Sequence, residues 1–406
     1  MAKTIEFAPQ GGATGKICLQ LPNTDATDLD FSRTSGATLK NENGVLEDVL
    51  PNIPRYTFED DGCPVLLLEP QSTNLITYSS DFTQWTTQRA NLTPNVITSP
   101  KGDLSGSLIV PTAVFGSHQI EKGISASPSG TYSIYIKADG YSAIRINSGS
   151  SGNGYAEFDT VTESVINSGG TYFEKAKITK EKDGWYRCQL TLSSGLSGNG
   201  LFIYVLNELN QQSYTADGTS GLYIWHGQLE ELPYASSPIE TDGAIETRTK
   251  DSASKTNLEN YINSSEGTFY FYGKALADSD INRFISLSDD SSNNFLQIRI
   301  NTTNVLQVRT FKGGSGLEII SSPTTNTLNY YKCAAVWSNT KLAMFVNGVK
   351  IDEKVVDNSY PTNTFNTLTF NNAVIGGSAN YEGKVKEFWV DDTALTDQEL
   401  IDLTTL

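Results

Sequence analysis

Three carboxylates with the spacing of a catalytic strand stand near the middle of the sequence, at Glu157, Asp159 and Glu163. Two carboxylates about 5–5.5 Å apart can act as nucleophile and acid in the hydrolysis of a glycosidic bond. However, residues 159–163 have the composition of a hairpin turn between strands at 155–158 and 164–166. Such a turn breaks the alternation that would bring Glu163 to the face of Glu157. We therefore predict no catalytic residue and keep a polysaccharide-degrading glycanase or lyase as an alternative function.

Aromatic side chains are the stronger chemical signal, because the apolar C–H faces of sugar rings stack on tyrosine and tryptophan. Tyr135 shares a strand face with Ser133 and Lys137, which favours exposure, and two further tyrosines lie beside loops rich in Gly, Ser and Asn. Core packing is the competing interpretation, since buried aromatic side chains fill sandwich cores. Trp225 is expected to be a core residue, and Tyr204 is a further aromatic candidate. The residues that we predict to bind a glycan are Tyr135, Tyr141, Tyr155 and Trp85.

Cysteine and histidine are too sparse to indicate zinc or nucleophilic chemistry. The sequence has 4 cysteines and 2 histidines, His118 and His226, and no two cysteines form a C-x-x-C unit. We expect mostly buried, reduced thiols. We also expect a hydrogen-bonded His226 within a strand and a solvent-exposed His118.

We expect no cofactor for this chain, but its short acidic clusters leave the binding of a structural calcium ion as an open alternative. Calcium takes six to eight oxygen ligands, and none of the clusters has the spacing of a twelve-residue calcium loop. Solvated turns are the simpler interpretation, so the metal ligands stay unassigned. The clusters are Asn23 with Asp25, Asp28 and Asp30; Asp278 with Asp280; Asp289 with Asp290; and Asp391 with Asp392.

The charge balance of the chain argues against two classes of partner. The 406 residues include 29 Lys and Arg and 46 Asp and Glu, which gives a net charge of −17. Nucleic-acid binding needs clustered basic side chains, and anionic lipid surfaces repel such a chain. No apolar run approaches the roughly 20 residues that cross a bilayer, and the segment after Met1 lacks the apolar region of a secretory signal. We therefore expect no nucleic-acid partner and no membrane insertion.

Short strands must position these side chains. Period-two alternation recurs between turns rich in Gly, Asn and Ser, and long helical periodicity is absent. The pattern predicts an all-β protein with two antiparallel β-sandwich (jelly-roll) domains. We place an irregular N-terminal segment at residues 1–75, one sandwich at 76–245 and a second at 256–406.

The second sandwich has the clearest local signals. Asn347-Gly348 predicts a tight hairpin, because both central positions of a type I′ turn need positive φ. Thr396 and Glu399 predict a capping box that opens one short helix. Together with segments 373–377 and 381–390, these features resemble a concanavalin A-like (laminin-G-like) sandwich.

The middle of the chain resembles a second family. Residues 183–187, 225–241 and 247–248 resemble the carbohydrate-binding-module-like jelly roll of bacteriophage fibres, and segments 31–38, 54–56 and 66–75 resemble the part that precedes it in head-spike and tail-fibre proteins. This resemblance implies a virion-surface protein that is a homo-oligomer, a homotrimer by our expectation. Its implied partners are other virion proteins, from the capsid or the tail, and a host-surface glycan.

A buried ion pair is expected to tie the N-terminal segment to a sandwich. Glu69 follows the apolar run 65–68, so its carboxylate should be partly buried and should need a partner. Arginine suits this role because its guanidinium can bind both carboxylate oxygens. The candidate partners are Arg33, Arg55 and Arg248.

These interpretations lead to one favoured hypothesis and two alternatives. We favour a non-enzymatic bacteriophage fibre or spike protein whose residues 1–75 attach it to the virion and whose sandwiches bind host-surface glycans for adhesion. The alternatives are the glycanase or lyase above and a purely structural, capsid-decorating protein.

Overall fold

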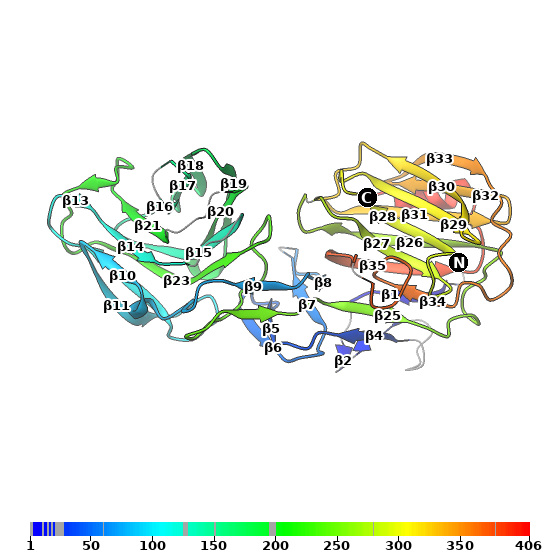
Figure 1. Ribbon diagram of the computed structural model, residues 1–406, viewed down its shortest axis with the longest axis horizontal. Coiled ribbons are helices and arrows are strands. Elements are labelled where there is room, and N and C mark those ends of the chain that lie inside the picture. The colour runs from blue at the N-terminus through cyan, green and yellow to red at the C-terminus, as the bar shows by residue number, and fades with distance from the viewer. Residues whose placement is uncertain are drawn as a thin grey trace. The chain divides into compact units, whose positions relative to one another are not determined.

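The computed structural model describes residues 3–9, 12–13, 16–17, 19–20, 28–59, 61–124, 129–149, 152–194, 200–278, 280–377 and 379–406. Its helices within these ranges are α1 (Asp397–Thr404) and the short 3-10 turns η1 (Phe82–Gln84) and η2 (Lys182–Gly184), and almost all other regular structure is strand (Figure 1). The predicted all-β fold is therefore confirmed. The chain divides into two compact units: unit 1 comprises Met1–Gly36, Val49–Pro70 and Thr249–Leu406, and unit 2 comprises Ala37–Asp48 and Gln71–Arg248.

The first sheet of unit 1 has eight strands among the described residues. Its order is β33-β32-β31-β26-β35-β8-β7, and the N-terminal strand also pairs with β35. The strands are β1 (Lys3–Phe7), β7 (Arg55–Phe58), β8 (Pro64–Leu68), β26 (Glu266–Ala275), β31 (Tyr331–Ser338), β32 (Lys341–Val346), β33 (Val349–Val355) and β35 (Gly383–Asp391).

The second sheet of unit 1 has nine strands within the described ranges, in the order β2-β3-β4-β25-β34-β27-β28-β29-β30. Alternate side chains of both sheets form one apolar core, which includes Phe271, Trp337 and Leu287. The strands are β2 (Gly12–Ala13), β3 (Lys16–Ile17), β4 (Leu29–Ser32), β25 (Ser252–Lys255), β27 (Arg283–Ser288), β28 (Phe295–Ile300), β29 (Leu306–Lys312), β30 (Ser315–Ser322) and β34 (Thr367–Thr369).

Two local predictions in unit 1 are confirmed. Asn347 and Gly348 join β32 to β33 with φ of 48° and 80°, as the tight hairpin requires. Thr396 and Glu399 form the predicted capping box of α1. The apolar side of this helix packs through Leu400 on the outer face of the first sheet.

Unit 2 contains two six-stranded sheets within its described residues, with a shared apolar core between them. Their orders are β10-β14-β21-β16-β17-β18 and β11-β12-β23-β15-β20-β19. The first has β10 (Thr86–Gln88), β14 (Gln119–Lys122), β16 (Ala143–Ser148), β17 (Gly154–Asp159), β18 (Ser164–Gly169) and β21 (Leu201–Leu206). The second has β11 (Ala90–Ile97), β12 (Gly106–Pro111), β15 (Gly130–Asp139), β19 (Phe173–Lys180), β20 (Tyr186–Leu192) and β23 (Gly221–Glu230).

Three short strand pairs complete the described secondary structure. They are β5 (Ala37–Lys40) with β6 (Leu46–Val49), β9 (Ser72–Asn74) with β24 (Glu246–Arg248), and β13 (Gly116–Ser117) with β22 (Ser213–Tyr214). The β5–β6 turn places Leu46 in a small apolar cluster of unit 2.

The expectation that residues 1–75 are irregular is wrong for the part that the structure describes. Strands β1, β7 and β8 belong to the first sheet of unit 1, and β4 belongs to the second. The predicted linear boundaries 1–75, 76–245 and 256–406 therefore differ from the two units, because unit 2 is inserted between strands of unit 1. Local sequence could not show this arrangement, since β1 pairs with β35 near the other end of the chain.

Candidate functional site

The outer face of the β10–β18 sheet of unit 2 gathers aromatic and charged side chains. Each strand alternates, so Ile144 and Ile146 of β16 point into the core while Arg145 points outward. We call this outer surface the arginine–tyrosine face and define it by Arg145, Asn147, Tyr155, Glu157, Phe202 and Tyr204.

Strand register aligns these residues in two neighbouring rows. Arg145 of β16 lies opposite Glu157 of β17 on one side and Tyr204 of β21 on the other. One step along the sheet, Asn147 lies between Tyr155 and Phe202 in the same way. Each row therefore contains a central polar side chain with an aromatic side chain on the adjoining strand.

Arg145 connects the two rows. Its guanidinium carbon lies 3.6 Å from the centre of the Tyr155 ring, and its Nη1 lies 3.2 Å from Oε1 of Glu157. Tyr155 is partly exposed, while the side chains of Arg145 and Glu157 are 16% and 9% exposed. The charged pair and the stacked ring hold each other in place, because both contacts use the planar guanidinium.

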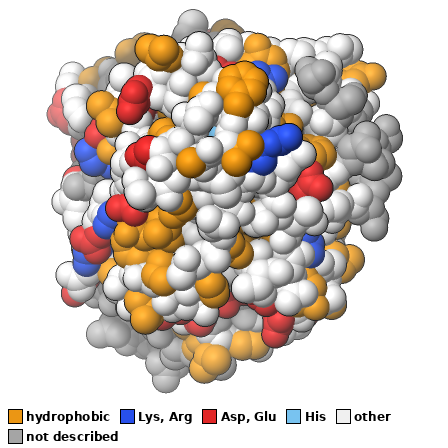
Figure 2. Space-filling view, turned by 90° about the vertical axis from the view of Figure 1, so that its left-hand side faces the viewer, with side chains coloured by type: hydrophobic (Ala, Val, Ile, Leu, Met, Phe, Trp, Pro, Cys, Tyr) orange, Lys and Arg blue, Asp and Glu red, His pale blue; other side chains and the backbone are white. Residues whose placement is uncertain are grey.

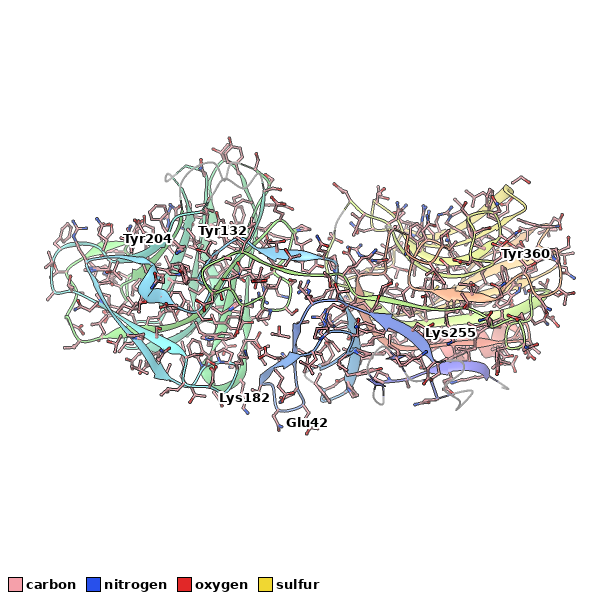
Figure 3. All side chains as sticks on the ribbon, turned by 60° about the horizontal axis from the view of Figure 1, so that its bottom comes forward. Glu42, Tyr132, Lys182, Tyr204, Lys255 and Tyr360 are labelled. Carbon is pink, nitrogen blue, oxygen red and sulfur yellow. The ribbon has the colours of Figure 1, made fainter. Side chains whose placement is uncertain are left out.

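Phe202 and Tyr204 extend the aromatic surface along β21. Their ring centres are 6.4 Å apart with an interplanar angle of 16°, and both side chains are partly exposed. Tyr204 can be located in Figure 3. Burial raises the pKa of the Tyr204 phenol above its ordinary value, and the charge of Arg145 opposes that rise.

Two polar atoms of this face have no hydrogen-bond partner among the described residues. Asn147 is 4% exposed, and its Oδ1 accepts no hydrogen bond within the described part of the chain, although its Nδ2 donates to the carbonyl of Gly149 at 3.1 Å. The Nε of Arg145 also has no partner there. Both atoms are themselves buried, so they are polar groups that the described residues leave unsatisfied rather than groups exposed to a ligand.

The predicted glycan-binding residues separate into one that lies on this face and three that do not. Tyr155 is on the arginine–tyrosine face, whereas Tyr141 and Trp85 are 7% and 6% exposed and pack in the core of unit 2. The Tyr141 ring contacts Tyr214, and Nε1 of Trp85 donates to the carbonyl of Tyr78 at 2.9 Å. Side chains of this kind cannot stack on a sugar without opening the core.

Tyr135 is likewise buried, contrary to the predicted exposure. It is 2% exposed and packs at 5.0 Å from Trp225, in a cluster with Trp185 and Leu46. The alternation of β15 correctly placed Tyr135 away from the main core. It could not reveal that Trp185, Trp225 and Leu46 form a second apolar cluster with Tyr135 on that outer face.

Arg145 and Phe202 were missed by the sequence analysis. A local signal was present, because Arg145 stands between Ile144 and Ile146 and a charged residue between two apolar ones in a strand faces outward. Which other side chains share its face depends on strand register, and register required the structure.

The three carboxylates of the catalytic-type spacing do not share one site. Glu157 pairs with Arg145, and Asp159 accepts a hydrogen bond from the amide of Val161 at 3.0 Å in the turn that follows β17. Glu163 contacts Lys180 and accepts a hydrogen bond from Tyr186 Oη at 2.8 Å. The hairpin predicted from residues 159–163 is present between β17 and β18.

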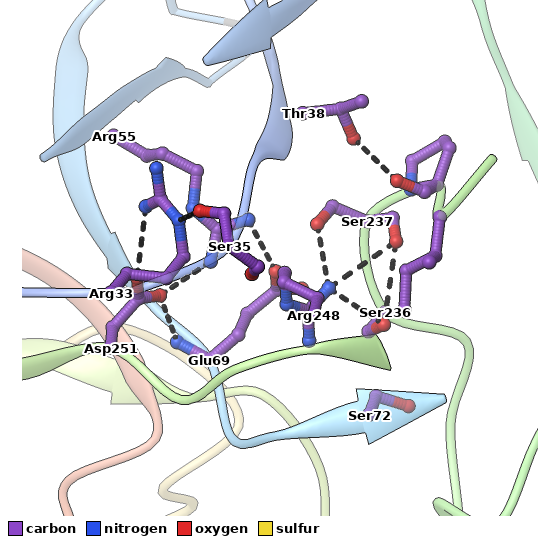
Figure 4. Close-up of polar contacts among 12 residues, drawn as sticks. Arg33, Ser35, Thr38, Arg55, Glu69, Ser72, Ser236, Ser237, Arg248 and Asp251 are labelled. Atoms are coloured by element: carbon purple, nitrogen blue, oxygen red, sulfur yellow. Dashed lines mark hydrogen bonds and ion pairs between the residues drawn. The ribbon is translucent and has the colours of Figure 1, made fainter. Parts of the chain in front are cut away.

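The arginines proposed as partners of Glu69 take different positions (Figure 4). In unit 1, Nη1 of Arg55 lies 2.5 Å from Oε2 of Glu69, and its Nη2 contacts Asp251. Nη1 of Arg33 lies 3.1 Å from Oδ1 of Asp251. No sequence motif had indicated Asp251 as a partner. Within unit 2, Arg248 donates from Nη1 to Oγ of Ser236 at 3.0 Å and to Oγ of Ser237 at 2.9 Å.

Histidine and cysteine are placed as follows. His226 is buried with Nε2 at 3.0 Å from Oε1 of Gln228, as expected. His118 is also buried, contrary to prediction. Its Nδ1 lies 2.7 Å from the carbonyl oxygen of Arg89, and its Nε2 lies 3.1 Å from the carbonyl oxygen of Tyr214. Cys188 and Cys333 are buried, Cys63 is exposed, and Cys18 lies outside the described residues.

Two of the acidic clusters serve turns. Asp289 accepts a hydrogen bond from Oγ of Ser291 at 2.6 Å, and Asp391 accepts one from Oγ1 of Thr393 at 2.6 Å. Asn23 and Asp25 lie outside the described residues. Within the ranges that the structure describes, no three Asp, Glu, His or Cys side chains gather as metal ligands would.

The surface shown in Figure 2 is mainly uncharged, and its Lys and Arg side chains are scattered rather than gathered. This agrees with the low proportion of charged residues, 18% of the chain. None of the described helices has the length and hydrophobicity that a membrane span requires.

Comparison with known proteins identifies the fold of one part of the chain. Residues 248–401 match the family model of the Concanavalin A-like lectin/glucanases superfamily. No curated protein matches the chain.

Several solved structures share a limited likeness of fold with this chain. The CBM40 of the Ruminococcus gnavus IT-sialidase bound to alpha2,3 sialyllactose has 18% identity and a TM-score of 0.31, covering 34% of this chain and 83% of that one. The native heptameric SAP-like pentraxin from Limulus polyphemus has 17% identity and a TM-score of 0.31, covering 36% and 71%. Domain 4 of AbnA, an arabinanase from Geobacillus stearothermophilus, in complex with arabinotriose has 13% identity and a TM-score of 0.29, covering 38% and 73%.

Proposed function

We propose that the chain is a non-enzymatic glycan-binding protein whose arginine–tyrosine face holds the sugar. The observation that carries the proposal is the stacking of Arg145 on Tyr155, beside Glu157 and Tyr204, on a partly exposed sheet face. The aromatic rings supply apolar surfaces for the C–H faces of a saccharide. The charged pair of Arg145 and Glu157 supplies fixed hydrogen bonds for its hydroxyl groups.

The absence of bond cleavage is part of the proposal. It is supported by the roles of the carboxylates, since Glu157 is neutralised by Arg145 and Glu163 by Lys180. A glycosidase needs one carboxylate positioned as acid and a second as base or nucleophile across the same bond. The matching test is the release of reducing ends from polysaccharides, which we expect to be absent for the wild-type chain and for Glu157→Gln alike.

The biological setting is proposed from the resemblance of residues 31–75 and 183–248 to phage spike and fibre proteins. In this setting the chain is a homotrimer on the virion surface, it is mounted on capsid or tail proteins, and it attaches the particle to a host glycan. Imaging of labelled intact particles tests the placement, and the mass of the purified chain in solution tests the trimer.

A glycan array followed by titration calorimetry tests the binding site. We expect Tyr155→Ala and Tyr204→Ala to weaken binding of the best array ligand by about tenfold each, since stacked aromatics contribute roughly 1 kcal/mol or more. Phe115→Ala is the matched control, because Phe115 is an aromatic side chain of unit 2 that is 70% exposed and lies outside this face. Equal binding by all three variants and the wild type would refute the site.

A further inference from the structure

A second cluster, on the outer face of the β27–β28–β29 part of unit 1, holds two arginines that have no counter-ion among the described residues. Ile298 and Val308 point into the core, so their neighbours Arg299 and Arg309 point outward. Arg299 lies opposite Phe284 and Gln307, and Arg309 lies opposite Gln297. We call this surface the two-arginine face and define it by Phe284, Gln297, Arg299, Gln307 and Arg309.

The register brings the two guanidinium groups into the same area. Arg299 and Arg309 are diagonal neighbours on adjacent strands, a spacing that long side chains bridge readily. Both lie over the buried Phe284, with guanidinium carbons 5.8 Å and 6.0 Å from its ring centre, and Arg309 also lies 5.3 Å from the centre of the Phe295 ring. The rings and the strands fix the positions of both cations.

Neither cation has a carboxylate partner within the described part of the chain. Arg299 donates from Nε to Oε1 of Gln307 at 3.0 Å, and the Nε of Arg309 has no partner there. Burial lowers the pKa of Arg299. Burial and the nearby charge of Arg299 lower the pKa of Arg309 to about 10. Two positive charges are thus held close together, and their repulsion raises the free energy of the unliganded protein. A bound anion would remove this repulsion.

Three other arginines of the chain do have a carboxylate partner. Arg33 and Arg55 share Asp251, and Arg145 has Glu157. The chain has 46 acidic residues, so a counter-ion for Arg299 or Arg309 would have been easy to provide. Beneath them, Gln297 is fully buried, and its Oε1 has no partner among the described residues.

We propose that the two-arginine face is a binding site for an acidic saccharide, one that carries a carboxylate or sulfate group on an otherwise neutral ring. Planar guanidinium groups bind such oxyanions through paired hydrogen bonds. The net charge of −17 disfavours long polyanions, so a single acidic group on a neutral scaffold fits best. This site goes beyond the proposed function of unit 2 and shares with it only the class of ligand.

Titration calorimetry with matched ligands tests this proposal on the full chain. The probes are uronic-acid-containing and sulfated oligosaccharides, their neutral counterparts, and inorganic sulfate. We expect the acidic forms to bind at least about tenfold more tightly than the neutral forms, and this preference to disappear in Arg309→Ala and Arg299→Ala. Arg89→Ala, which removes an exposed arginine of unit 2, is the control and should keep the preference.

Three results would overturn the proposal. They are equal affinity for acidic and neutral forms, an acid preference that persists in both arginine variants, and binding of inorganic sulfate as tight as that of the acidic saccharide. Arg309→Gln gives a further readout, because removing one of two repelling charges should raise the Tm of the unliganded chain. The tyrosine variants separate this site from the one in unit 2. Tyr155→Ala and Tyr204→Ala should weaken binding of the best array ligand, while the preference for acidic over neutral oligosaccharides should be retained.

Discussion

The Arg145 guanidinium carbon lies over the Tyr155 ring, 3.6 Å from the ring centre, while its Nη1 lies 3.2 Å from Oε1 of Glu157. A single side chain therefore sets both the orientation of an aromatic platform and the position of a carboxylate. Because the three residues come from two adjacent strands, the sheet itself fixes their spacing.

The first prediction concerns this arginine. Arg145→Ala removes the stack and leaves Glu157 unpaired, so we expect glycan affinity to fall by about tenfold or more. Arg145→Lys keeps the charge but not the planar stacking surface, and we expect an intermediate loss. Calorimetric titration with the best array ligand measures both. Affinity that is unchanged in Arg145→Ala would show that the face takes no part in binding.

The second prediction concerns the buried ion pairs of unit 1. Asp251 contacts both Arg33 and Arg55, and Arg55 also contacts Glu69. Glu69→Gln leaves a buried arginine with one carboxylate fewer, so we expect a loss of about 3 kcal/mol in the free energy of unfolding. Asp251→Asn should cost more, because Arg33 and Arg55 each lose a carboxylate contact.

Chemical denaturation of these variants tests the ion pairs. Glu163→Gln is the control, since the pair of Glu163 with Lys180 is exposed and its loss should have a far smaller effect. Stability that is unaffected by Glu69→Gln would contradict a structural role for the pair.

The third prediction is a pH dependence in the acid range. Burial alone would raise the pKa of Glu59, but the ammonium groups of Lys384 and Lys274 outweigh it and bring the pKa down to about 2. A carboxylate with a depressed pKa stabilises the folded state fully above its ordinary pKa, near 4.5. That contribution is lost as the pH falls from about 4.5 to 2. Tm values of wild type and Glu59→Gln should therefore differ at pH 5 and converge towards pH 2.

The fourth prediction covers a higher pH window. Burial of His226 lowers its pKa to about 3, despite a contact with Gln228 that favours the charged form. The folded state therefore favours the neutral ring. The resulting contribution of His226 to the free energy of unfolding is fully present above the ordinary pKa of 6.5. Stability should fall as the pH drops from 6.5 towards 3. In His226→Gln the slope of Tm against pH should be shallower between pH 6.5 and 5, and an identical slope would contradict the assignment.

Local rules accounted for much of the fold. The Asn347-Gly348 hairpin and the Thr396–Glu399 capping box depend on a few neighbouring residues, and both were predicted. The hairpin at 159–163 followed from its turn composition in the same way. Such features are decided by backbone conformation within one turn, so sequence alone suffices.

Features that depend on distant residues were not accessible to the same reasoning. Tyr135 is buried in a cluster with Trp185, Trp225 and Leu46, and strand β1 pairs with β35. The candidate sites are of this kind. Tyr155 was selected by its aromatic type and its flanking loop, but its arginine partner comes from a neighbouring strand. Arg299 and Arg309 carried no signal until the register showed that they are diagonal neighbours on adjacent strands.

The insertion of unit 2 between strands of unit 1 has a consequence for biogenesis. Strand β8 must pair with β35, whose residues leave the ribosome only after the whole of unit 2 has been made. At roughly 5–20 residues per second, the apolar segment 65–68 waits on the order of tens of seconds for that neighbour. Unit 2 can fold during this interval, whereas the early strands of unit 1 need protection from aggregation until β35 has been synthesised.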